Sequence, residues 1–181
     1  MSEAEGEAGR RMAGLARPMQ HAVNNLFMVL VMNLEAIQGS LPPEDRNAVR
    51  LGRALQGARQ AEALLRSYLR LGRPEEQGEI DSARFLEAVL PVLNLAAGKP
   101  LTLEVAAAAP VRPARPRADI ALLALAEGVR GLPASAPRRL RLEGRLLTAS
   151  WPAPEAALPL LAAAGMPAEV AGEETRLCLG A

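Results

Sequence analysis

The sequence feature that most constrains the fold is an apolar residue that recurs every three or four positions between residues 19 and 37. At about 100° per residue, these side chains fall on one narrow face of a helix, and spacings that alternate between four and three are typical of helical bundles. The stripe consists of Met19, Val23, Phe27, Leu30, Leu34 and Ile37. Pro18 either begins this helix or lies inside a longer one that starts near Glu5, because proline fits a first turn but removes a backbone donor elsewhere.

A second amphipathic helix is predicted from about Glu44 to Leu71, after a break in "GSLPPED". Arginines fill one side of it, and its apolar side carries Leu51, Leu55, Ala58, Leu65 and Leu69. The short connection predicts an antiparallel hairpin. Two helices cannot cover both of their own apolar stripes. Either a second copy of the hairpin completes a dimeric four-helix bundle, or the rest of the same chain covers it.

The composition changes at Gly72 to Glu79, "GRPEEQGE", which predicts a domain boundary. We therefore expect an α+β protein with a helical hairpin over residues 1–74 and a small α/β sandwich over residues 79–181. The connector "VAAAAPVRPARPRA" is predicted to be partly disordered. The expected elements of the second domain are a helix capped by Asp81 and ending at Ala96, a strand over Leu101 to Val105, a helix over Arg117 to Leu132, two strands that turn at Gly144, a short helix containing Pro159, and a terminal strand in "TRLCLGA".

Composition and charge argue against several classes of protein. The chain has 21 Lys and Arg against 20 Asp and Glu, a net charge of +1, so it lacks the large positive field of a nucleic-acid binder. Its single cysteine, Cys178, cannot form an internal disulfide, which indicates a reducing, cytoplasmic setting. The N-terminal residues contain no apolar signal core. The apolar run Leu26 to Met32 is far shorter than the ~20 residues that span a bilayer, so we expect no membrane association.

The only histidine, His21, is the first candidate for a reactive group. His21 and Asn25 lie one turn apart and point about 160° away from the apolar stripe, so both are predicted to face water. The same side continues with Met28 and Met32, where a solvated helix normally carries charge. Methionine suits an adaptable docking surface. The alternatives are a surface histidine without function, and methionines that become core when the second half of the chain folds over them.

The segment "HAVNNLFMVLVMNLEAI" resembles the phospho-accepting box of sensor histidine kinases, in the variety whose histidine precedes an acidic residue, one more residue and two asparagines. His21, Asn24, Asn25 and the segment Asn33 to Glu35 occupy matching places. In that family the hairpin is the dimerisation and histidine phosphotransfer domain, and an ATP-binding domain of mixed helix and sheet follows it. The resemblance therefore implies that His21 is phosphorylated and that the chain is a homodimer through its hairpin.

The resemblance fails at every element that would bind ATP. No asparagine follows Asn94, and Gly128 stands where the family has its magnesium-binding asparagine. No aspartate follows Asp119, so the Asp-x-Gly-x-Gly element that recognises adenine is missing, as is the glycine-rich lid. Ala22 replaces the acidic neighbour of the histidine, which the family uses as a base. A neutral imidazole can still attack an activated phosphoryl group. We therefore expect a degenerate second domain and a donor other than ATP.

These features predict a histidine phosphotransferase of a two-component phosphorelay. His21 would be the nucleophile and carrier, Asn25 would orient the phosphoryl group or a water, and Asn24 would assist or only flank. Docking of response-regulator receiver domains is assigned to Arg17, Met28 and Met32. No cofactor is expected in this chain, because the receiver would bring the aspartyl phosphate and the Mg²⁺.

Three other functions fit the same residues. A catalytically silent pseudokinase that binds and sequesters a response regulator or a kinase needs the methionine surface but not the imidazole. An active autokinase needs a divergent nucleotide site. A purely structural dimerising domain needs neither phosphorylation nor receiver binding.

Overall fold

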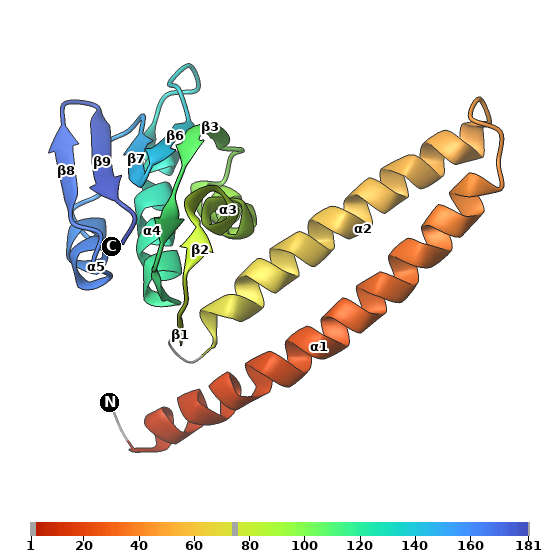
Figure 1. Cartoon of the computed structure of the whole chain (residues 1–181), viewed down its shortest axis with the longest axis horizontal. Helices are drawn as coiled ribbons and strands as arrows, with labels where there is room; N and C mark the ends of the chain where they lie inside the picture. Colours follow the sequence, from red (N-terminus) through yellow and green to blue (C-terminus); the bar gives the residue numbers. More distant parts are fainter. Residues whose placement is uncertain (1–2, 74–75, 181) are drawn as a thin grey trace. The chain divides into compact units, whose positions relative to one another are not determined.

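The chain is an α+β protein, and its computed structural model describes residues 3–73 and 76–180. It divides into two compact units, Met1–Arg73 and Pro74–Ala181. The first is an antiparallel helix pair, and the second is a mixed five-stranded sheet with helices (Figure 1). Among the described residues, no helix combines the length and the apolar character needed to cross a membrane.

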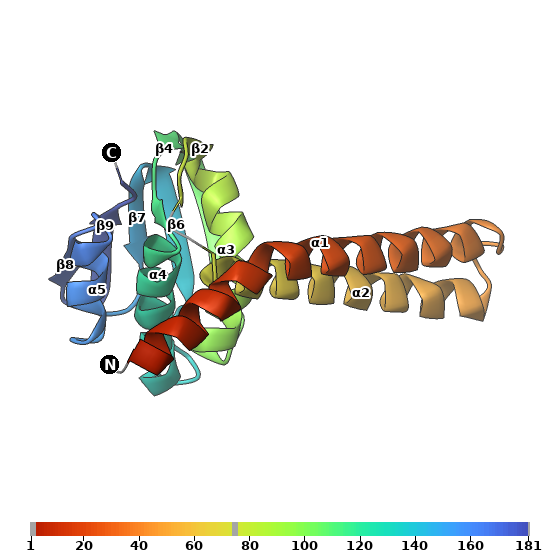
Figure 2. The ribbon, with the colours of Figure 1, turned by 90° about the horizontal axis from the view of Figure 1, so that it is seen from below.

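The first unit consists of α1, Glu3–Gly39, and α2, Arg46–Leu71. Pro18 lies inside α1, so of the two expected positions the structure shows the longer helix. The side chain of Asp45 accepts a hydrogen bond from the backbone N–H of Asn47 at 2.7 Å and caps α2. The second helix therefore begins two residues after the predicted Glu44. The two helices lie side by side in antiparallel orientation (Figures 1 and 2).

Only part of the predicted apolar stripe of α1 packs against α2. Its members Val23, Phe27 and Leu34 are half-buried, whereas Met19, Leu30 and Ile37 are exposed. The strip of α1 that packs against α2, here called the seam, also includes polar and apolar residues that lie beside the predicted stripe. Of these, Gln20 is buried, and Asn24, Val31 and Gln38 are half-buried. The prediction of one narrow seam was therefore wrong. One flank of the stripe packs within the hairpin, and the other stays open.

The second unit is a two-layer sandwich. Its sheet has the strand order β3-β6-β7-β9-β8, in which β3 and β6 are parallel and the other neighbours are antiparallel. The helices α3, α4 and α5 cover one face of this sheet (Figure 2). The elements are α3 Ser82–Ala97, β3 Thr102–Ala108, α4 Arg117–Glu127, β6 Arg139–Gly144, β7 Leu146–Ala149, α5 Ala157–Ala163, β8 Ala168–Ala171 and β9 Glu174–Cys178.

Alternation along the strands places the core between the sheet and the helices. In β6, Leu140 and Leu142 are buried, whereas Arg139 and Arg141 are exposed on the opposite face. Trp151 is fully buried, and its indole Nε1–H donates to the carbonyl of Leu125 at 2.9 Å. The largest fully buried side chains are Trp151, Phe85, Leu86, Leu93, Leu122, Leu125, Leu140, Leu142, Leu147, Leu161, Met166 and Leu179.

The connector over residues 105–118 is ordered, so the prediction of partial disorder was wrong. Two short antiparallel ladders hold it: β1, Glu76–Gln77, pairs with β5, Ala114–Arg115, and β2, Ile80–Asp81, pairs with β4, Pro110–Val111. These pairings join segments that are distant in sequence, and composition alone does not reveal them. The backbone hydrogen bonds stabilise a stretch that its Ala, Pro and Arg content made look disordered.

A buried ion pair also anchors this connector. The Arg115 guanidinium lies 5.0 Å from the centre of the Phe85 ring and bonds Asp119 of α4, with Nε 2.8 Å from Oδ2. Asp119 is almost fully buried, and Arg115 is nearly so. Burial of an ion pair of this kind is tolerated because its polar atoms are satisfied by hydrogen bonds.

The remaining elements follow the sequence closely. Asp81 caps α3 as predicted, accepting from the N–H groups of Ala83 and Arg84. The strand β3 runs three residues beyond the predicted Val105, and the helix predicted over Arg117 to Leu132 ends at Glu127 and continues as a 3₁₀ turn, Gly128–Gly131. The strand β8 was not predicted, because Val170 is its only strongly strand-forming residue.

Candidate functional site

His21 lies on an exposed part of α1, as predicted. Gln20, the residue before it, is buried against α2, and one further step of about 100° around the helix carries His21 out of that seam. Ala22, the next residue, is also exposed and offers no carboxylate to the imidazole. The imidazole can therefore be approached from outside the hairpin, with no acidic side chain in the neighbouring position.

Three residues share this exposed side with His21, and together the four form the histidine face: His21, Asn25, Met28 and Met32. Their spacing of four, three and four keeps them within one strip of the helix surface. Asn25 is exposed, and Met28 and Met32 are 56% and 61% exposed. The helix α2 does not cover them. No charged residue occurs between His21 and Leu34 in the sequence, so this face offers amide and thioether groups without a carboxylate.

Asn24 does not belong to the histidine face. It is half-buried, and its Oδ1 atom is buried without a hydrogen-bond partner among the described residues. Its position on the helix lies between the seam and His21, so of the two predicted asparagines Asn25 is the one on the same side as His21. Arg17, the remaining predicted docking residue, belongs to α1, but its side chain lies outside the described part of the chain.

The last residues of the hairpin lie level with His21. Contacts between the helices pair Gln38 Nε2 with the carbonyl of Ala48 at 3.5 Å, and Arg59 with Glu35 at 2.5 Å. At the open end, Arg73 Nη2 donates to Oε1 of Gln20. Sequence reasoning missed this polar pair. A glutamine next to the histidine, at a seam position where an apolar residue would be usual, was the available signal.

The residues around Gly128 do not fit a nucleotide with its magnesium ion. A Cβ atom at Gly128 would lie 3.0 Å from Cδ of Pro154 and 3.2 Å from the carbonyl oxygen of Pro152, so no larger side chain is accommodated there. Val129 beside it is fully buried. In the described part of the chain, His, Cys, Asp and Glu form no group of three that could bind a metal ion. An asparagine of the kind that binds magnesium in the kinase family would therefore have no room at position 128.

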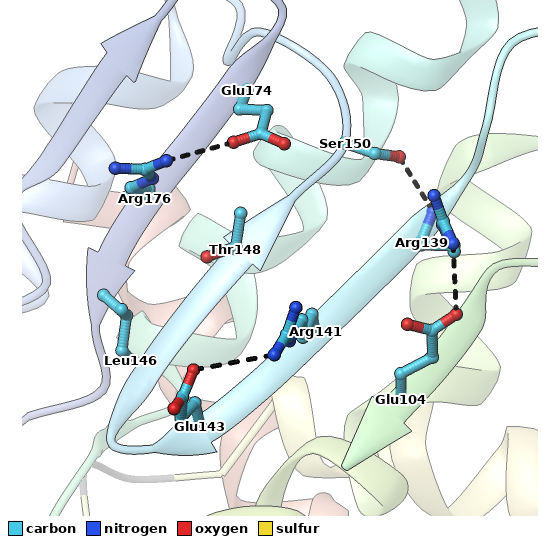
Figure 3. A pocket seen from close by; sticks show the side chains of 9 residues that line it. All are labelled: Glu104, Arg139, Arg141, Glu143, Leu146, Thr148, Ser150, Glu174 and Arg176. Carbon is cyan, nitrogen blue, oxygen red and sulfur yellow. Dashed lines mark hydrogen bonds and ion pairs between the residues drawn. The ribbon is translucent and has the colours of Figure 1, made fainter. Parts of the chain in front are cut away.

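The open face of the sheet carries a hollow of about 430 Å³, which is lined mainly by charged side chains (Figure 3). These side chains are already paired within the face: Arg139 with Glu104 at 3.6 Å, and Arg176 with Glu174 at 3.3 Å. Arg141 lies 3.9 Å from Glu143 in the same way. The lining contains three arginines and three glutamates, so the hollow has no net charge with which to select a phosphate or a cation.

The candidate chemistry therefore lies on the hairpin, with His21 at its centre. A scan against protein-family models found no match to this chain, and neither did a search of the curated proteins. The second unit has a packed core, and the hollow on the open face of its sheet is lined by equal numbers of arginines and glutamates. The hairpin adds an exposed imidazole on a face that carries no charge of its own.

Proposed function

We propose that the chain is a histidine phosphotransferase of a two-component phosphorelay, which carries a phosphoryl group on His21 without using ATP. The observation that supports this most strongly is the exposed imidazole on a helix face with an amide one turn away and two exposed methionines beyond it. A phosphoryl carrier needs a nucleophile that a partner can reach in line, and it needs little other chemistry of its own.

The proposed reaction moves one phosphoryl group between two side chains. The unprotonated imidazole nitrogen of His21 attacks the phosphorus of an aspartyl phosphate on a receiver domain. The bond between phosphorus and the aspartate oxygen breaks, the carboxylate leaves, and the imidazole loses its other N–H proton to solvent. The receiver supplies the Mg²⁺ that neutralises the charge in transfer. Asn25, one turn from His21, would donate a hydrogen bond from its side-chain amide to the phosphoryl oxygens.

Met28 and Met32 are proposed as part of the receiver-docking surface. They continue the histidine face toward the hairpin turn, and both are more than half exposed. Flexible, polarisable methionine side chains adapt to more than one partner surface, which suits a carrier that must meet both a donor and an acceptor. Arg17, four residues before His21 in the sequence, would attract the acidic side chains that hold Mg²⁺ in a receiver.

A homodimer through the hairpin is part of this proposal. Leu26 is 71% and Leu30 is 45% exposed, on a flank of α1 that lies about 100° from the seam with α2. On α2, the exposed Leu65 lies about 80° around the helix axis from the buried Leu55. This rotation has the same sense as the rotation from the seam to Leu26 and Leu30 on α1. Because the helices are antiparallel, these two flanks lie on the same side of the hairpin. His21 lies on the opposite side, so a second hairpin can cover the flanks and leave the histidine face open.

Transfer of label from a phosphorylated receiver tests the proposed function. The full chain, incubated with radiolabelled receiver phosphates from its own organism, should acquire acid-labile and base-stable label that His21→Ala abolishes. Asn25→Ala should keep the label but slow its transfer. The proposal is wrong if no receiver labels the wild-type chain under conditions in which an established phosphotransferase accepts label from the same receivers.

The second candidate function is a silent binding module that sequesters a receiver or a kinase. The exposed methionines favour it independently of the imidazole. Receiver binding measured by calorimetry, together with transfer of label from the receiver, separates the two functions when the wild type is compared with His21→Ala. A silent module binds equally well in both forms and never becomes labelled, whereas a carrier loses its label with the imidazole.

A further inference from the structure

Asn24 carries a buried hydrogen-bond acceptor that the hairpin leaves unused. The Oδ1 atom of this half-buried side chain is shielded from solvent and has no hydrogen-bond partner among the described residues. Most buried polar atoms in proteins are hydrogen-bonded, so this exception indicates a donor that a small rearrangement can supply. Because water does not reach the atom, the donor is expected among the side chains beside Asn24.

Two side chains of the preceding turn lie where that donor is needed. Helical side chains lean toward the N-terminus, so the Asn24 amide covers the turn that contains Gln20 and His21. Gln20 is buried, and its Oε1 atom accepts from Arg73 at the end of the hairpin. His21 is exposed, so its ring can rotate about both side-chain bonds. Residues three apart have Cβ atoms about 5–6 Å apart, and a ring nitrogen of His21 can therefore reach Oδ1 of Asn24.

We propose that Asn24 is a positioning residue, whose Oδ1 atom accepts a hydrogen bond from Nδ1–H of the neutral His21 ring and leaves Nε2 unprotonated for attack. This inference rests on the proposed phosphorylation of His21. The hydrogen bond that one ring nitrogen makes determines which nitrogen carries the proton. Ala22, the immediate neighbour of the histidine, has no acceptor in its side chain, and Asn24 supplies one from the following turn.

The hydrogen bond orients the nucleophile and takes no part in the bond changes. Nδ1 and Nε2 lie on different edges of the ring, so turning Nδ1 toward the seam directs Nε2 outward to the receiver. Nε2 attacks the phosphorus of the aspartyl phosphate, a nitrogen–phosphorus bond forms, and the aspartate carboxylate leaves. Because a neutral amide oxygen takes up no proton, the Nδ1 proton then leaves to solvent.

A purely structural role of Asn24 makes a different prediction. If Asn24 only packs in the seam, its replacement changes the thermal stability of the hairpin and leaves the protonation of His21 unchanged. A freely solvated neutral imidazole carries its proton mainly on Nε2. A ring with its proton on Nδ1 is therefore the signature of an acceptor beside Nδ1.

The test reads the position of the ring proton by NMR on the full chain. His21 is the only histidine, so ¹⁵N-histidine labelling gives the signals of a single ring, and about pH 8.5 keeps an ordinary histidine neutral. We expect most of the wild-type ring to be in the Nδ1–H form. One hydrogen bond shifts such a ratio by about five- to tenfold, so Asn24→Ala should lower this fraction about threefold. Phosphorylation of Nε2 by potassium phosphoramidate, in which the phosphorus–nitrogen bond breaks and ammonia leaves, should slow by the same factor.

Two variants control for the change of side chain. Gln38→Ala removes another half-buried amide of the seam, near the hairpin turn, and should leave the ring proton of His21 where it is. Asn24→Asp keeps an oxygen acceptor and should retain the Nδ1–H form. Thermal unfolding of each variant shows whether the hairpin has loosened.

Two results overturn the inference. One is a wild-type ring that carries its proton mainly on Nε2, which needs no variant to observe. The other is an unchanged ring in folded Asn24→Ala. The proposed function fails separately, if receivers do not label wild-type His21 even though phosphoramidate does.

Discussion

Replacing Leu26 with glutamate should dissociate the proposed dimer. Leu26 is 71% exposed on the open flank of α1, so a second hairpin would have to bury most of it. Full burial of a leucine contributes about 1.5–3 kcal/mol. Because 71% of each leucine would be buried on each of two symmetry-related chains, the two leucines contribute about 2–4 kcal/mol to the free energy of dimerisation. Burial of two glutamate carboxylates without partners would cost at least about 1–3 kcal/mol more. The Kd of the dimer should rise about a hundredfold or more.

Sedimentation equilibrium of the full chain over a range of concentrations measures this change. Met28→Glu is the matched control, because it introduces the same side chain at an exposed position of the same helix but on the histidine face. Circular dichroism of both variants checks that α1 remains helical. The proposed interface is refuted if Leu26→Glu associates as tightly as the wild type, or if Met28→Glu is the variant that dissociates.

Three other predictions concern the two units separately. Asp119→Ala leaves the Arg115 guanidinium buried without its carboxylate, and urea unfolding should show a loss of about 3–5 kcal/mol. Gly128→Asn forces a side chain against Pro154, so it should destabilise the second unit by about 1–3 kcal/mol in the same assay and should produce no ATP binding by calorimetry. Met28→Glu should raise the KM for phosphotransfer from a receiver about tenfold or more without changing the labelling of His21 by phosphoramidate, and equal transfer rates would contradict the proposed docking surface.

The sequence predicts those parts of the fold that depend on local signals. Asp81 caps α3 because its carboxylate reaches the free N–H groups of the first turn, and Gly144 ends β6 because its backbone adopts a positive φ of 65°. The ladders of β1 with β5 and of β2 with β4 were missed, since they pair segments more than 25 residues apart. The buried pair of Arg115 with Asp119 was missed for a similar reason, because both residues read as surface charge.

The sequence predicts on which side of α1 the candidate site lies, but it does not predict which neighbouring residues are buried against α2. Helical periodicity placed His21 and Asn25 opposite the stripe, and both are exposed. Periodicity could not tell which flank of the stripe α2 would cover, because packing selects the seam from the details of both helices. The inward position of Asn24 and the bond from Arg73 to Gln20 both depend on that choice.

The three sides of α1 explain why the proposed functions can coexist on one helix. The seam around Gln20 packs against α2, the flank around Leu26 is exposed and is the proposed surface for a second copy, and the histidine face points about 140° away from that flank. A substitution on one side therefore leaves the other two sides intact, which is why Leu26→Glu and Met28→Glu should separate dimerisation from docking.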